Sequence, residues 1–230
     1  MDEEKIIRDA ELFIKQHEKD LIRQFADPEL YHADAKPVSL FMAGSPGAGK
    51  TEVSKRLIEK FSTKPVRIDA DDIRILFRNY DGSNAHLFQS ACTIGVNKLY
   101  DHVVRRGLNV ILDGTFAYAG ALKNVERSIN HNRKVEIYYL YQDPLVAWSF
   151  TQKREALEHR RVSAEVFIKS FVCSRDNVNK AKQQFIERVE LNLIVKNFNT
   201  GLDILELNIN NVDPYLDRIY TETALREIIK

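Results

Sequence analysis

The chain has 230 residues and a formal net charge of +1; 44% of its residues are hydrophobic and 29% are charged. This length and composition are those of a globular protein of one domain, with or without an added arm. The near-zero net charge excludes a global electrostatic attraction to nucleic acid, which is therefore not an expected partner. Two cysteines, an acidic N-terminus and the lack of a long apolar run predict a cytoplasmic protein with reduced thiols and no membrane contact.

The hydrophobic pattern begins with an arm and continues as alternating strands and helices. Residues 3 to about 26 have apolar side chains at helical spacing and predict one amphipathic helix. We expect residues 1–36 to form this helix and a linker, and residues 37–230 to form the main domain. Strands are predicted, in chain order, over residues 38–44, 65–72, 108–114, 134–141, 191–198 and 203–209. Helices are predicted over residues 50–61, 71–80, 87–107, 120–131, 144–188 (with a break near 160–163) and 214–230, the last starting at Pro214.

This alternation predicts an α/β fold, in which a doubly wound, mostly parallel sheet carries helices on both faces. In such sheets, ligands bind beyond the carboxyl ends of the strands. Four loops that follow predicted strands contain glycines or acidic residues: "GSPGAGKT", "DADD", "DGTF" and "QDP". We therefore expect these loops to meet at one edge of the sheet and to form the functional site.

The first of these loops matches the phosphate-binding pattern G-x-x-x-x-G-K-[ST] without a mismatch. Its glycines allow the backbone N–H groups to form a concave anion site, and the helix that follows adds its positive N-terminus. Lys50 is expected to reach the β- and γ-phosphates, and the Thr51 hydroxyl to bind Mg²⁺. The pattern predicts a nucleoside triphosphate, ATP or GTP, bound by Gly44, Ser45, Pro46, Gly47, Ala48, Gly49, Lys50, Thr51 and Glu52.

An aspartate ends the third predicted strand, "NVILDG", in the manner of a Walker B motif. Asp113 is therefore a candidate for holding Mg²⁺ through water. The alternative is an acidic residue that only caps the end of a strand. No guanine-reading "NKxD" sequence follows, which argues against a GTPase, and the chain is small for a motor.

A kinase also needs a carboxylate close to the acceptor hydroxyl, and "RIDADDIR" offers three of them behind the second strand. Asp69 ends the strand. Asp71 comes just beyond it, where a substrate hydroxyl can reach, and is our candidate for the catalytic base. Asp72 is the residue we expect only to cap the helix that follows.

Cations that neutralise the transferring phosphate are expected in a lid around residues 145–165. Arg154 and Arg161 lie seven residues apart, so they share a face if the helix continues through both. Lys153 and Arg160 flank them. The alternative interpretation is a solvated helix face, on which Arg154 pairs with Glu158.

With these stretches together, the chain resembles the zeta toxin family of P-loop kinases over roughly residues 38 to 200. The resemblance rests on "GSPGAGKT", on "IDADD" for the family's I-D-x-D, on "ILDGT" for its I-E-G-T, and on the arginines of "TQKRE" and "RRVS". It implies phosphorylation of UDP-N-acetylglucosamine at the sugar 3′-hydroxyl with ATP or GTP, and neutralisation of many members by an antitoxin.

The resemblance also implies roles for single residues. Asp71 matches the catalytic base, Lys50 the phosphate lysine, and Arg154 and Arg161 the two lid arginines. Asp113 and Thr115 match a substrate-contacting acid and threonine, although Asp113 is one methylene shorter than the family's glutamate. Asn97, or a neighbour on the same long helix, stands where some members have a substrate-binding glutamate, so the departures lie on the acceptor side.

Two alternatives stay open beside the nucleotide-sugar kinase. One is a P-loop kinase for another small molecule, such as a nucleoside, an antibiotic or a polynucleotide 5′-end. The other is a nucleotide-binding regulatory protein with little catalysis, against which the set of Lys50, Thr51, Asp71 and the lid arginines argues. The N-terminal helix has two interpretations as well: a helix packed on the core, or a docking place for a separate antitoxin.

Overall fold

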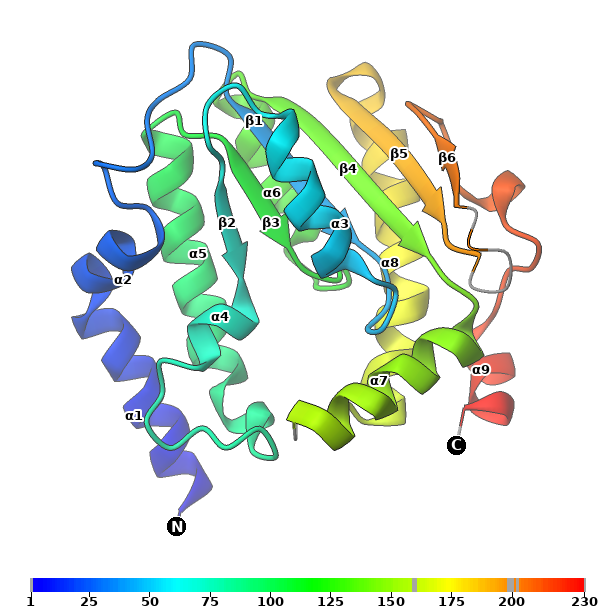
Figure 1. The fold of residues 1–230 in the computed structure, drawn as a ribbon, viewed down its shortest axis with the longest axis horizontal. Coiled ribbons are helices and arrows are strands. Elements are labelled where there is room, and N and C mark those ends of the chain that lie inside the picture. The colour runs from blue at the N-terminus through cyan, green and yellow to red at the C-terminus, as the bar shows by residue number, and fades with distance from the viewer. Residues whose placement is uncertain (1, 159–160, 198–200, 202, 230) are drawn as a thin grey trace.

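A central sheet organises the protein, as shown by a computed structural model that describes residues 2–158, 161–197, 201 and 203–229 (Figure 1). Among these residues the sheet has six strands in the order β2-β3-β1-β4-β5-β6. Neighbouring strands from β2 to β5 are parallel, and β6 is antiparallel to β5. The strands are β1 (Val38–Ala43), β2 (Val66–Asp69), β3 (Val110–Asp113), β4 (Lys134–Tyr141), β5 (Val189–Val195) and β6 (Ile204–Glu206). The predicted α/β fold with a mostly parallel sheet is confirmed.

Helices cover both faces of the sheet, because the central strands are apolar on both sides. One face carries α3 (Lys50–Leu57) and the 3₁₀ turn η1 (Ile58–Lys60), which pack on Leu40 and Met42 of β1. The opposite face carries α5 (Gln89–Arg105), α6 (Ala121–Asn130) and α8 (Ala164–Phe185), behind the sheet in Figure 1. Gly107, with φ 64°, follows the end of α5 in the left-handed conformation that commonly ends a helix.

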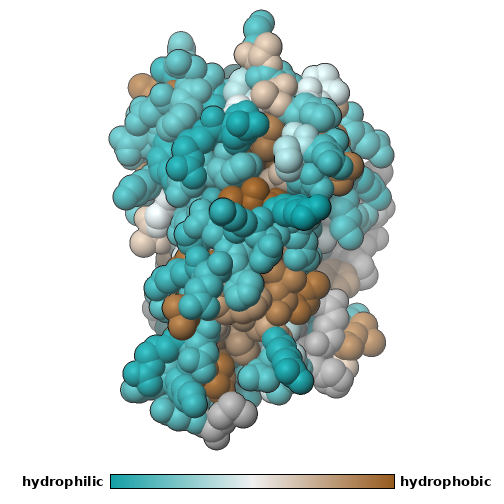
Figure 2. Space-filling view, turned by 90° about the vertical axis from the view of Figure 1, so that its left-hand side faces the viewer, coloured by the Kyte–Doolittle hydropathy of each residue, from teal (hydrophilic) through white to brown (hydrophobic). Residues whose placement is uncertain are grey.

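The N-terminal arm consists of two helices, α1 (Glu3–Gln16) and α2 (Glu18–Phe25), rather than the single predicted helix. The break falls at His17, whose backbone (φ −103°, ψ 28°) leaves the helical region. Ile14 and Leu21 are buried in the main hydrophobic core, and both helices lie against α5. Figure 2 shows that the outer face on this side of the molecule is mainly hydrophilic, with smaller hydrophobic areas. The arm is therefore part of the packed core, as the first of its two interpretations expects.

The remaining helices are short, apart from α7. They are α4 (Ala70–Arg74), η2 (Ala85–Phe88), α7 (Pro144–Glu158), η3 (Ile186–Arg188), η4 (Asp213–Tyr215) and α9 (Glu222–Ile228). The prediction of a terminal helix from Pro214 is wrong, because Pro214 lies in a 3₁₀ turn and the helix is started later by Thr221, whose hydroxyl caps Ala224 N at 3.2 Å. None of the helices in the described ranges combines the length and apolar character needed to cross a bilayer.

Candidate active site

The glycine-rich loop joins β1 to α3 and fits closely under neighbouring elements. Gly44 and Gly47 have φ of 134° and 75°, which side chains rarely adopt. A Cβ on Gly44 would overlap the carbonyl oxygen of Leu140 in β4, and one on Gly47 would overlap that of Ala147 in α7. Glycine is therefore required at both positions for the loop to lie against the sheet edge and α7.

Two donors of the loop meet at one carbonyl oxygen. Lys50 Nζ donates to the carbonyl oxygen of Ser45 at 2.7 Å, so the ammonium lies across the loop, and Ala48 N donates to the same oxygen at 3.3 Å. A helix start offers its first N–H groups no intrahelical acceptor, so the start of α3 is a favourable position for an anion. Thr51 is exposed in the first turn, whereas Glu52 pairs with Arg56 at 2.8 Å on the outer surface. The loop geometry suits a bound phosphate chain.

A guanidinium gathers three carboxylates at the carboxyl ends of β2 and β3, where Asp69 and Asp113 lie opposite each other in register. Arg67 Nη2 donates to Asp69 Oδ2 at 2.6 Å and to Asp113 Oδ2 at 2.7 Å, and Arg67 Nη1 donates to Asp72 Oδ2 at 2.7 Å. Ser54 Oγ of α3 also donates to Asp113 Oδ2, at 2.6 Å. Asp113 is thereby tied to the helix behind the phosphate loop, and its side chain is only 3% exposed.

The charges in this cluster shift each other's protonation. Burial raises the pKa of Asp69 to about 6, and repulsion from Asp71 and Asp113 adds to the rise. Burial alone would lower the pKa of Arg67, but the carboxylates of Asp113 and Asp69 outweigh it and raise that pKa. The arginine therefore stays charged at the centre of the cluster.

Asp71 lies in the first turn of α4, where the residue that caps the helix is not the one we predicted. Asp69 is the N-cap of this helix, since its Oδ1 accepts from Asp71 N at 2.9 Å; Asp72, predicted to be the cap, pairs with Arg67 instead. The Asp71 carboxylate forms an ion pair with Arg74, which is buried and donates from Nη2 to Gln89 Oε1 at 2.9 Å. The prediction of Asp71 missed Arg74, although their i,i+3 spacing was a readable signal.

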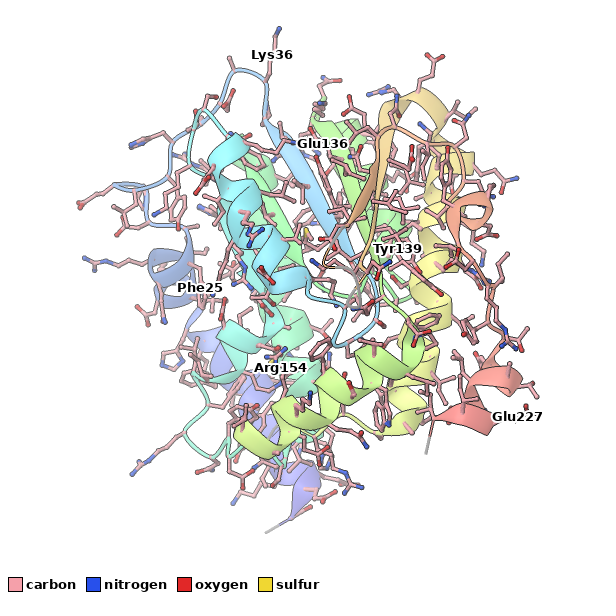
Figure 3. All side chains as sticks on the ribbon, turned by 45° about the vertical axis from the view of Figure 1, so that its right-hand side comes forward. Phe25, Lys36, Glu136, Tyr139, Arg154 and Glu227 are labelled. Carbon is pink, nitrogen blue, oxygen red and sulfur yellow. The ribbon has the colours of Figure 1, made fainter. Side chains whose placement is uncertain are left out.

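The expected lid is α7, which begins against the phosphate loop. Besides the Ala147 carbonyl, a Cβ on Gly47 would meet Thr151 Oγ1 at 2.8 Å. Residues 147, 151 and 154 follow helical spacing, so Arg154 continues the face of α7 that touches the loop. Figure 3 shows Arg154 on the part of α7 that passes below α3 and α4. Its position is therefore compatible with a bound γ-phosphate.

Arg161 does not share that helix face. Helix α7 is described as far as Glu158, and Arg161 itself is not helical, so the condition for a common face is not met. The side chain of Arg161 is 75% exposed, and its Nε lies 3.9 Å from Glu155 Oε1. Lys153 Nζ lies 5.5 Å from the centre of the Phe150 ring. The flanking Arg160 lies outside the described residues.

Two predicted acceptor-side residues lie in different places. Thr115 is in the loop after β3; its carbonyl accepts from Gly44 N at 3.2 Å and its Oγ1 accepts from Ala117 N at 3.3 Å, so it lies beside the phosphate loop. Asn97 is exposed in the middle of α5, about 12 Å along the helix from Gln89. Its neighbour Lys98 pairs with Glu18 of α2. The structure brings Thr115 to the strand ends and does not bring Asn97 there.

The residue after β5 is a further neighbour of the loop that we had not singled out. A Cβ on Gly49 would lie 3.8 Å from Lys196 Cε, and Lys196 Nζ pairs with Asp203 at 2.7 Å. It belongs to the stretch "VKNFNTG", of which residues 198–200 lie outside the described residues. Lys196 adds a positive charge on the side of the loop away from Asp71.

The residues present fit a Mg²⁺ ion that takes most of its ligands from the nucleotide and water. Within the described ranges, no group of three or more His, Cys, Asp or Glu side chains is arranged to hold a metal. Mg²⁺ needs only one or two protein oxygens beside substrate phosphates, and the exposed Thr51 hydroxyl offers one. The predicted second ligand, Asp113, has its Oδ2 engaged by Arg67 and Ser54.

The amino-acid sequence matches one known protein family. A family model described as "Zeta toxin" matches residues 23–203. No curated protein matches the chain. Among solved structures, the chromosomal PezAT toxin–antitoxin system of Streptococcus pneumoniae aligns with a TM-score of 0.64 at 16% identity, over 94% of this chain and 86% of that chain.

Two other solved structures share the fold at similar identity. The AvrRxo1-ORF1:-ORF2 complex with ATP aligns with a TM-score of 0.62 at 14% identity, over 93% of this chain and 70% of that chain. The Pnkp1/Rnl/Hen1 RNA repair complex aligns with a TM-score of 0.51 at 16% identity, over 78% of this chain and 50% of that chain. The sequence identities are low, so these structural alignments establish only the fold, which is that of the P-loop kinases.

Proposed function

Because this chain belongs to the zeta toxin family and has a P-loop kinase fold, we propose that it transfers the γ-phosphoryl group of ATP or GTP to a sugar hydroxyl of a nucleotide sugar, UDP-N-acetylglucosamine at its 3′-hydroxyl or a relative. The observation that carries the proposal is the placement of Asp71. It lies one residue past the N-terminus of α4, at the strand end beside the one that carries Asp113, and is held by Arg74. A site that only binds nucleotides has no use for a carboxylate held in this way.

In the proposed reaction, residues 44–51 bind the triphosphate through backbone N–H groups and Lys50. Bound Mg²⁺, held by the Thr51 hydroxyl, would neutralise charge on the β- and γ-phosphate oxygens. The oxygen of the acceptor hydroxyl bonds to the γ-phosphorus, and the bond between the γ-phosphorus and the β,γ-bridging oxygen breaks. Asp71 accepts the proton of the attacking hydroxyl in this step. Lys50 and Arg154 stabilise the negative charge that moves to the leaving nucleoside diphosphate. Arg161, which is exposed after α7, has a smaller part in this proposal.

Thr115 and Asp113 have different parts in this proposal. Thr115 lies beside the phosphate loop and is the acceptor-side residue we keep as a substrate contact. Asp113 is buried behind Arg67, so direct contact with the acceptor would require that ion pair to open. Asn97 keeps the substrate role only if the acceptor extends along α5. The acceptor is therefore the part of the proposal that most needs a direct test.

We also propose that this protein acts as a toxin in the cytoplasm and that a separate antitoxin protein neutralises it. This proposal is supported by two of the similar structures, one of a toxin–antitoxin system and one of a two-protein complex. The N-terminal helices are packed on α5, so only their outer faces are accessible to such a partner.

Label transfer from ATP or GTP to a panel of acceptors tests the function. The panel contains UDP-N-acetylglucosamine and other nucleotide sugars, nucleosides, aminoglycosides and 5′-hydroxyl oligonucleotides. We expect label on a nucleotide sugar, lost in Asp71→Asn while nucleotide binding persists. Label on another acceptor would replace the nucleotide sugar and keep the kinase. Normal ATP binding with no labelled acceptor would favour the regulatory alternative.

A further inference from the structure

Arg67 occupies the place at the ends of β2 and β3 where our sequence analysis expected a metal. Its side chain is 15% exposed, and its guanidinium contacts the carboxylates of Asp69, Asp72 and Asp113. Asp113 Oδ2 alone receives Arg67 Nε at 3.0 Å, Arg67 Nη2 at 2.7 Å and Ser54 Oγ at 2.6 Å. These three donors occupy Asp113 Oδ2, so a cation could bind this carboxylate only through Oδ1, next to the Arg67 guanidinium.

The cation at this place is permanent. A guanidinium is not deprotonated in proteins, and the surrounding carboxylates raise the pKa of Arg67 further despite burial. A divalent ion approaching Asp113 would meet this fixed positive charge at contact distance. Displacing the arginine would leave it desolvated without its partners, so the arrangement resists exchange.

Arg67 also connects the two halves of the site. Through Asp113 and Ser54 it is linked to α3, the helix that starts at the phosphate loop. Through Asp69, which caps α4 at the N–H of Asp71, it is linked to the candidate base. Its position therefore affects both the donor side and the acceptor side.

We propose that Arg67 is a positioning residue that serves as the internal cation of the transfer site. Its guanidinium fixes Asp69, Asp72 and Asp113 and excludes Mg²⁺ from Asp113. Mg²⁺ therefore enters the site only with the nucleotide and is held by Thr51. The role of Thr51 rests on the proposed function. The exclusion of a metal from Asp113 does not, because it follows from contacts within the protein.

Mn²⁺ binding to the nucleotide-free protein, measured by electron paramagnetic resonance, tests the exclusion without any turnover. We expect no saturable Mn²⁺ site in the wild type. Arg67→Met should gain one, because three carboxylates then lack a cation, and it should bind Mn²⁺ at least about tenfold more tightly than the residual binding of the wild type. Arg67→Lys should behave as the wild type, since it keeps the charge. Arg78→Met, which removes an exposed arginine that makes none of these contacts, is the matched control. A wild-type site that Asp113→Asn abolishes would overturn the proposal.

The Mg²⁺ dependence of nucleotide binding decides the question even if Arg67→Met does not fold. Binding of a fluorescent ATP analogue is titrated with Mg²⁺ in the wild type, Asp113→Asn and Thr51→Val. We expect the half-saturating Mg²⁺ concentration to rise about tenfold in Thr51→Val and to change less than about twofold in Asp113→Asn. A rise of about tenfold in Asp113→Asn would make Asp113 a metal ligand and contradict the proposal. In transfer assays, Arg67→Met should lower kcat more than it raises KM for ATP, and Arg67→Lys should recover part of kcat.

Discussion

The Asp71 carboxylate and the Arg74 guanidinium form an ion pair across one turn of α4, with the arginine only 4% exposed and the aspartate 30% exposed. Arg74 reaches on to Gln89 at the start of α5, so the candidate base is anchored to a second helix. Arg74 Nε is buried, and no hydrogen-bond partner for it occurs among the described residues. An arginine buried at this cost fixes a geometry more than it stabilises the fold.

Arg74→Met should therefore reduce activity more than stability. The methionine fills much of the same volume without a buried charge, and Asp71 remains open enough to be hydrated. We expect the free energy of unfolding to change by less than about 2 kcal/mol. Phosphoryl transfer should fall about 10- to 100-fold, because the carboxylate loses its fixed orientation. Urea unfolding and single-turnover transfer measure the two effects.

Gln89→Ala is the control for this variant, because it removes the anchor of Arg74 and leaves the ion pair. Its effect on transfer should be smaller, within about tenfold. Full activity in Arg74→Met would show that Asp71 does not depend on its partner.

Asp69 should make the stability of the protein depend on pH. Burial and repulsion by Asp71 and Asp113 raise its pKa from 3.8 to about 6. The folded protein thus holds this proton more tightly than the unfolded chain, so the contribution is fully present below pH 3.8 and is lost as pH rises through about 6. Over that window, we expect the free energy of unfolding of the wild type to fall by about 3 kcal/mol relative to Asp69→Asn. The asparagine does not titrate, and it can still cap α4.

Urea unfolding at pH 4, 5, 6 and 7 on both proteins measures this difference. Other carboxylates titrate in both, so only the gap between the two curves reports on Asp69. Parallel curves would show that the carboxyl group is hydrated in solution and titrates normally.

Much of the fold was readable from the sequence because local patterns and tertiary packing agree there. The apolar run before Gly44 and the one before Asp113 became neighbouring parallel strands, and the helix predicted over residues 87–107 became α5. The errors fell where local signals compete. His17 carries no strong breaker chemistry, yet it divides the arm into two helices, and Pro214 suits a 3₁₀ turn as well as a helix start.

In the site, residues with a sequence motif were found and their partners were missed. Lys50 and Thr51 follow from a pattern whose mechanics are local. Arg67 was passed over because its partner Asp113 is 46 residues away in the sequence and meets it only when β2 and β3 pair. Lys196 reaches the loop only through the order of the sheet. Such contacts depend on strand register, which a single sequence does not specify.

Gly47→Ala should weaken nucleotide binding through α7. The added Cβ would overlap the Ala147 carbonyl and press on Thr151, in a backbone conformation that alanine rarely adopts. Strain of about 1–3 kcal/mol at this position corresponds to a loss of about 10- to 100-fold in affinity for ATP, read by calorimetry. Gly114→Ala is the matched control, because nothing lies within 4 Å of a Cβ built there. Equal affinities for both variants would show that the loop and α7 move apart easily.

Arg154 and Arg161 should differ in their importance for transfer. Arg154 continues the face of α7 that touches Gly47, whereas Arg161 follows the end of the helix and is exposed beside Glu155. We expect Arg154→Ala to lower kcat about a thousandfold, as for an arginine that stabilises charge on the transferring phosphate. Arg161→Ala should lower it less than about tenfold, like the exposed-charge control Lys153→Ala. Equal losses for both arginines would mean that the segment after α7 brings Arg161 to the phosphate once the nucleotide is bound, and the lid would then extend past Glu158.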